Sequence, residues 1–114
     1  MVDALSVVDG IGLGRPLCQE PYLCSQILAG KVHGSVAIQL SQYDFLTTAT
    51  ASMLQIRQIA NSQQPINLGL KESAPLFYQA VQELMASREK DTTGEVYMAP
   101  LVQGWNKPLT SAVI

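Results

Sequence analysis

An arginine that follows three glycines at alternate positions is the feature of this sequence best suited to chemistry. The glycines are Gly10, Gly12 and Gly14, and the arginine is Arg15. Glycine fits where a ligand or another backbone must come close, and backbone N–H groups at such a turn can point at a phosphate. Arg15 can add a forked, charge-assisted contact to the same anion. The stretch therefore predicts an anion-binding turn, although the glycines also suit a tight strand-to-helix turn without a ligand.

Two common phosphate motifs are excluded here. A P-loop needs a lysine followed by serine or threonine after its last glycine, and Arg15-Pro16 stands there instead. The glycine spacing also differs from the G-x-G-x-x-G dinucleotide fingerprint, and no acidic residue lies roughly 20 positions further on to hold a ribose.

Two elements are expected to position the turn. The apolar run that contains the glycines has the composition of a strand buried on both faces, as parallel strands in α/β proteins are. Its residues are Val7, Val8, Ile11 and Leu13. A short helix is expected over residues 21–29, because Pro21 suits a first-turn position and Gly30 suits the position just past a helix end.

A longer helix is predicted over residues 44–60, with Asp44 as its N-cap. Apolar residues recur there at steps of three and four, and this stripe is expected to face the core. The stripe consists of Leu46, Ala49, Met53, Ile56 and Ala60. The polar side, which is expected to face solvent, carries Gln55, Arg57 and Gln58.

A second long helix is predicted over residues 72–89, with Ser73 as its cap. Its apolar positions are Leu76, Phe77, Ala80, Val81, Leu84 and Met85. Residues 36–40 alternate in polarity and hint at a strand, although a helical turn fits them nearly as well. Residues 91–94 predict a turn, and the tail from residue 95 to residue 114 is expected to be extended or poorly ordered.

Composition limits the class of protein. The 114 residues suit one small domain, and charged residues make up 14%, against the ~25% usual for soluble domains. The net charge of −2 provides no basic field, which argues against a nucleic-acid partner. No apolar run reaches ~18 residues, so no membrane partner is expected, and the lack of a secretory signal predicts a cytoplasmic chain.

Cysteine and histidine give no sign of a catalytic or metal site. Cys18 and Cys24 match neither a redox pair nor a zinc site, and both are expected to be free thiols. His33 is the single histidine and is expected to be solvated. Because no nucleophile, base and orienting group can be assembled around it, no catalytic residue and no metal ligand is predicted.

Val8-Asp9-Gly10-Ile11-Gly12-Leu13-Gly14-Arg15-Pro16, followed by Glu20-Pro21-Tyr22-Leu23, resembles the last strand and next helix of a known family. This is the Old Yellow Enzyme family of FMN-dependent ene-reductases, also called NADH:flavin oxidoreductase/NADH oxidase, which is built on a TIM barrel. Residues 55–59 and 64–68 look like the family's C-terminal helix and its exit in fungal-type members. The resemblance ends near Leu70, and Tyr22 departs from it, because many members carry aspartate there.

The resemblance implies an α/β fold class, as the C-terminal piece of a TIM (β/α)8 barrel. As an isolated chain this piece is expected to be mostly α-helical, with one short buried strand near the N-terminus. Residues 1–70 would supply the last strand–helix unit and the C-terminal helix of an FMN-binding barrel. Residues 71–114 would add an amphipathic helix and an irregular tail.

The resemblance also implies a cofactor site. In the family the backbone of the Gly-Arg pair holds the FMN phosphate, a role that falls on Gly14 and Arg15, with Gly12 allowing close approach. NAD(P)H would be the donor and a small enone-type molecule the substrate of a full-length parent. The family's proton-donating tyrosine and its substrate-binding histidine or asparagine lie on earlier strands, which this chain lacks, so it is not expected to be active alone.

A second function class competes with this one. The two amphipathic helices would also serve a small, non-catalytic helical interaction module, which does not need the glycine-arginine turn. In either case the apolar excess favours self-association through exposed apolar surface.

Free FMN tests the isolated chain. A phosphate site needs donors from more than one loop, and the neighbouring loop is not in this sequence. We therefore expect the chain to leave the fluorescence of free FMN unchanged in a titration. Quenching at micromolar protein would contradict this prediction.

Overall fold

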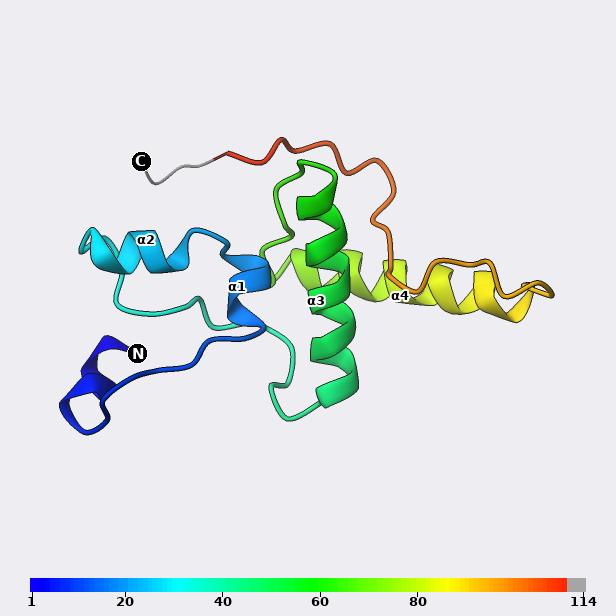
Figure 1. Cartoon of the computed structure of the whole chain (residues 1–114). Helices are drawn as coiled ribbons and strands as arrows, with labels where there is room; N and C mark the ends of the chain where they lie inside the picture. Colours follow the sequence, from blue (N-terminus) through cyan, green and yellow to red (C-terminus); the bar gives the residue numbers. More distant parts are fainter. Residues whose placement is uncertain (111–114) are drawn as a thin grey trace.

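Helices provide the regular secondary structure of the computed structural model, which describes residues 1–110. A 3-10 helix, η1 (Val2–Ser6), is followed by two short helices, α1 (Pro16–Gln19) and α2 (Leu23–Leu28). The two long helices are α3 (Phe45–Ala60) and α4 (Ser73–Glu89). Figure 1 shows α3 crossing α4 steeply, with α1 beside α3 and with α2 and η1 further out. The expectation of a mostly helical chain is confirmed.

The buried strand predicted near the N-terminus is wrong. Residues 7–14 have no regular secondary structure, and the side chain of Val7 is 83% exposed. Within residues 1–110 the only strand-like pairing is an isolated antiparallel bridge between Gln63 and Pro108. A parallel strand needs neighbouring strands to bond its N–H and C=O groups, and the described residues supply none. The α/β fold class is therefore not formed by this chain.

The short helix predicted after the glycines is confirmed as α2. Ala29 is its C-cap, and Gly30 follows with φ of +71°. This left-handed conformation is the one in which glycine commonly ends a helix. The strand hinted at over residues 36–40 does not form, but the N–H of Gln39 donates to the carbonyl of Leu68 over 2.8 Å.

The bounds and the N-cap of α3 are confirmed. The Asp44 carboxylate accepts hydrogen bonds from the hydroxyl of Thr47 at 2.6 Å and from its N–H at 3.1 Å. Both hydrogen bonds lower the pKa of Asp44 from its ordinary value of 3.8, and the bond from the Thr47 hydroxyl has the larger effect. Because the folded pKa is lowered, the cap is fully present above pH 3.8 and is lost as the pH falls through the lowered value.

The predicted orientation of α3 is wrong. Leu46, Met53 and Ile56, which were expected in the core, are exposed, whereas Gln55 and Gln58, which were expected in solvent, are buried. The buried residues of the helix are Thr48, Ala51, Ser52, Leu54, Gln55 and Gln58. The physical reason is that the loop packed against this side of α3 needs hydrogen-bond partners for its backbone, which the glutamines supply.

The helix predicted over residues 72–89 is confirmed as α4, but only part of its apolar stripe is buried. Phe77 and Ala80 are buried, while Leu76 and Met85 are exposed. Ser73 does not cap this helix: it is the first helical residue, and Glu72 occupies the cap position without a side-chain bond. The second half of α4 extends away from the other helices (Figure 1).

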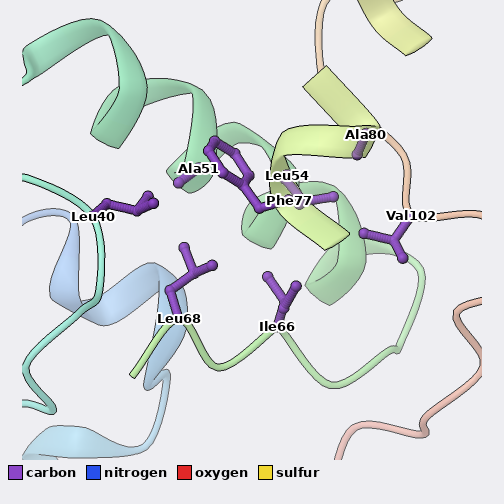
Figure 2. Packing of buried hydrophobic residues seen from close by; sticks show 8 residues of the cluster. All are labelled: Leu40, Ala51, Leu54, Ile66, Leu68, Phe77, Ala80 and Val102. Carbon is purple, nitrogen blue, oxygen red and sulfur yellow. The ribbon is translucent and has the colours of Figure 1, made fainter. Parts of the chain in front are cut away.

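One hydrophobic cluster joins α3, α4 and three loop segments. Its buried members are Leu40, Ala51, Leu54, Ile66, Leu68, Phe77, Ala80 and Val102. Figure 2 shows Phe77 of α4 beside Ala51 and Leu54 of α3, with Ile66 and Leu68 facing them from the loop. The loop after α3 therefore contributes two residues to this cluster, as each of the two long helices does.

The tail folds back onto the loop after α3. The expected turn at 91–94 is present, with the Asp91 carboxylate accepting from the N–H groups of Thr93 and Gly94. Beyond it, the tail follows α4 and passes the C-terminal end of α3 (Figure 1). The half-buried Trp105 donates its indole N–H to the carbonyl of Gln64 over 2.7 Å. The tail is thus irregular as expected up to residue 110, and residues 111–114 lie outside the described range.

The chain is more open than a compact domain of its size. The Cα radius of gyration is 15.8 Å, against roughly 13 Å for a compact domain of this length.

Within residues 1–110 no helix has the length and apolarity that crossing a bilayer requires.

Gly69 marks the tightest approach between two segments of the loop layer. A Cβ added there would lie 2.3 Å from the side chain of Val36 and 3.1 Å from the carbonyl of Ala37. We expect Gly69→Ala to destabilise the fold by about 1–3 kcal/mol through overpacking. Urea unfolding measures the effect. Gly12→Ala is the matched control, because a Cβ there meets no atom within 4 Å, and equal stability losses in the two variants would contradict this reading.

Candidate functional site

The glycine-arginine turn is the irregular segment that leads directly into α1. Gly12 and Gly14 lie in the irregular segment before the helix, and Arg15 is its N-cap. A Cβ added to Gly10, Gly12 or Gly14 would meet nothing within 4 Å. The described residues therefore provide no neighbour that requires glycine here, and the backbone of the turn is accessible to a ligand or to another chain.

The Arg15 side chain points toward the start of α3. Its Nη1 donates a hydrogen bond to the hydroxyl of Thr48, and the guanidinium carbon lies 5.5 Å from the ring centroid of Phe45. Thr48 in turn donates to the carbonyl of Asp44 over 2.9 Å. A hydroxyl and an aromatic ring hold the guanidinium in place without neutralising its charge. Arg15 therefore remains able to attract an anion.

A cavity of about 490 Å³ lies beside Arg15, within the range of ligand pockets. Its polar lining consists of Arg15, Gln19, Glu20, Ser35, Gln42, Thr48, Ser52 and Gln55. Arg15 is the only cationic residue in this lining, and the Glu20 carboxylate accepts from the N–H of Val36 over 2.8 Å. The cavity thus carries one charge of each sign among neutral hydrogen-bonding groups.

Three buried glutamines lie on α1 and α3, and we call Gln19, Gln55 and Gln58 the glutamine cluster. The side-chain oxygen of Gln19, Oε1, accepts hydrogen bonds from the backbone N–H of Leu68 at 2.9 Å and from the side-chain amide of Gln55 at 3.2 Å. The Gln55 amide also donates to the carbonyl of Ile66 over 3.1 Å. α1, which begins directly after Arg15, is thereby tied to α3 and to the loop after it.

The third glutamine bonds the same loop from one helical turn further along. The side-chain oxygen of Gln58, Oε1, accepts a hydrogen bond from the backbone N–H of Ile66 over 2.8 Å. Its Nε2 is buried without a partner among the described residues. A buried unsatisfied amide costs free energy, so the bond to Ile66 stabilises this position of Gln58 while the unpaired Nε2 opposes it.

The glutamine cluster is the part of the site that the sequence interpretation missed. Gln55 and Gln58 were assigned to solvent because they are polar, although their spacing of three residues places them on one side of a helix. A usable signal was the pattern Thr48, Ser52 and Gln55, polar and uncharged at steps of four and three. Such residues can be buried when a neighbouring loop needs hydrogen-bond partners.

The remaining candidate groups stay apart from this site. Cys18 is half-buried and Cys24 is exposed, and both are free thiols. His33 is exposed, as expected for a solvated histidine. Among residues 1–110 no group of three or more His, Cys, Asp or Glu side chains is arranged to hold a metal ion.

Sequence comparison relates this chain to a class of protein, the flavin oxidoreductases. No family model matches it. The relative found is an NADH-dependent flavin oxidoreductase of Aspergillus parasiticus, to which the chain is 39% identical over 110 residues. The match confirms the resemblance to the NADH:flavin oxidoreductase family of the Old Yellow Enzyme type.

The match extends over nearly the whole of this chain but over only part of the relative. It covers 96% of this chain and therefore reaches well past residue 70, where the motif resemblance was expected to end. The helix α4 and part of the tail thus belong to the region of similarity. The chain spans 25% of the length of the relative.

Gln55→Met tests the glutamine cluster. Methionine has a similar size but no donor, so the carbonyl of Ile66 and the oxygen of Gln19 would each lose a bond. We expect a loss of about 1–3 kcal/mol of unfolding free energy, measured by urea denaturation. Gln79→Met is the control, because Gln79 is exposed and bonds only to Glu83 of its own helix. A stability equal to that of the unchanged chain would show that the cluster contributes nothing net.

Proposed function

We propose that this chain is a segment of an FMN-dependent NAD(P)H oxidoreductase of the ene-reductase type. Its part in that enzyme is to contribute the turn that binds the FMN phosphate. The observation that carries the proposal is the 39% identity to a flavin oxidoreductase over nearly the whole chain. The Gly14-Arg15-Pro16 motif agrees with it.

The geometry of the turn supports an anionic ligand. The space beside Gly12 and Gly14 is open, so a phosphate can approach the backbone. The N–H groups of Gly14 and Arg15 donate to no backbone carbonyl within residues 1–110, which leaves them available to phosphate oxygens. Arg15 adds a positive charge that its own contacts leave intact.

These residues fit FMN through its phosphate, and they do not fit catalysis by themselves. When bound, FMN supplies electron transfer from NAD(P)H to an activated C=C bond of a small enone-type substrate. The family resemblance assigns the proton-donating tyrosine and the substrate-binding histidine or asparagine to other strands. The role proposed for this chain is therefore to bind and orient the cofactor.

The proposal also places the elements in a larger architecture. Residues 1–70 correspond to the last strand–helix unit and C-terminal helix of a TIM barrel, and residues 71–114 to an added helix and tail. In that setting residues 7–14 gain the neighbouring strands that they lack here. The exposed side chain of Val7 is the kind of residue that such neighbours would bury.

Arg15→Ala in a complete parent enzyme tests the proposed role. A charge-assisted hydrogen bond contributes about 1.5–3 kcal/mol, which corresponds to an FMN affinity weakened roughly tenfold to a hundredfold. The measurement is the FMN dissociation constant from flavin fluorescence, with Arg15→Lys expected to lose less than Arg15→Ala. Lys71→Ala, which removes an exposed charge on the loop before α4, is the control. Unchanged FMN affinity in Arg15→Ala would favour the alternative, a non-catalytic helical interaction module.

A further inference from the structure

Helix α3 carries an apolar face that residues 1–110 leave largely exposed. Leu46 is 76% exposed, Ile56 is 54% exposed and Met53 is 38% exposed. Successive helical residues advance by about 100° around the axis, so these three positions lie on one side of α3. Phe45 begins the helix beside them and is also exposed. We call Phe45, Leu46, Met53 and Ile56 the outer face of α3.

The outer face is more apolar than the buried face of the same helix. The buried side includes Thr48, Ser52, Gln55 and Gln58, whereas the outer face is built from large hydrophobic side chains. A helix at the surface of a globular protein has the opposite arrangement. This pattern suits a helix packed between two layers, and the hydrophobic cluster within residues 1–110 provides one of them.

The accessible surface of the chain is larger than that of a compact monomer of the same mass. The chain exposes 7672 Å², against roughly 6,100 Å² for a compact monomer of this mass. The excess of roughly 1,600 Å² is about twice what one partner contributes to a standard protein–protein complex. Part of this excess follows from the open shape of the chain, and the exposed outer face of α3 adds to it.

We propose that the outer face of α3 packs against the body of a flavin oxidoreductase, formed by sequence of the kind that fills the other three quarters of the relative. In the relative, the region similar to this chain is joined covalently to that sequence. The body is therefore the occupant that the comparison supports, in preference to a second copy of this chain. The inference rests on the proposed function for the nature of the body, but it does not require FMN to be bound.

Cysteine labelling tests the outer face without relying on activity. The full-length relative is prepared with its matching quarter replaced by this chain, and the 114-residue chain is prepared alone. In both proteins Cys18 and Cys24 are first replaced by serine, and in the chimera the relative's own cysteines are replaced as well. Ile56→Cys is then introduced into both proteins. A maleimide should label the introduced thiol rapidly in the chain alone and roughly tenfold or more slowly in the full-length chimera. Gln82→Cys, on the exposed side of α4, provides the matched reference.

The other outcomes of this experiment overturn the inference. Equal labelling rates in both proteins would mean that the body does not cover the outer face. Slow labelling in the chain alone, with a dimer in sedimentation velocity, would assign the face to a second copy. The chimera's FMN content is read separately by absorbance. If an Arg15→Ala chimera loses FMN but keeps the Ile56→Cys thiol protected, both proposals are supported. If a chimera binds FMN while its Ile56→Cys thiol is labelled rapidly, only the proposal about the outer face is overturned.

Discussion

Side-chain amides, in place of strand pairing, satisfy the buried backbone between residues 66 and 68, and the rest of the structure depends on them. An unpaired backbone group in the interior costs about as much as a lost hydrogen bond. The glutamine cluster meets this requirement from α1 and α3 together. It thereby brings Ile66 and Leu68 into the hydrophobic cluster and fixes α1 against α3. Arg15 reaches Thr48 because the helix that it precedes is held in this way.

Local signals in the sequence predicted the helices well. Asp44 and Gly30 mark helix ends through their own chemistry, since a carboxylate can bond a free N–H group and glycine tolerates positive φ. The orientation of α3 could not be predicted in the same manner. Its apolar stripe indicates burial against something, and periodicity does not say whether that partner belongs to residues 1–110. In this chain the stripe is exposed and the polar side, with Gln55 and Gln58, is buried.

The candidate site was predictable in its residue types and not in its contacts. Gly14 and Arg15 stand out by composition, and the sequence comparison supports the family to which their motif points. The bond from Arg15 to Thr48 joins residues 33 positions apart, which no local pattern predicts. The strand expected before the turn failed for a related reason. A parallel strand exists only through its neighbours, so its apolar composition describes an environment that these residues do not create.

The contact between Trp105 and Gln64 closes a loop of chain that contains α4. Two further bonds reinforce the closure, from the N–H of Gln64 to Lys107 and from the N–H of Leu109 to Ser62. The tail beyond α4 is therefore tied to the loop after α3, the same loop that leads into the N-terminal end of α4. A force applied to the tail reaches these bonds before it reaches the helix. Release of the tail would break these bonds and expose Val102, whereas α4 has its own place in the hydrophobic cluster through Phe77 and Ala80.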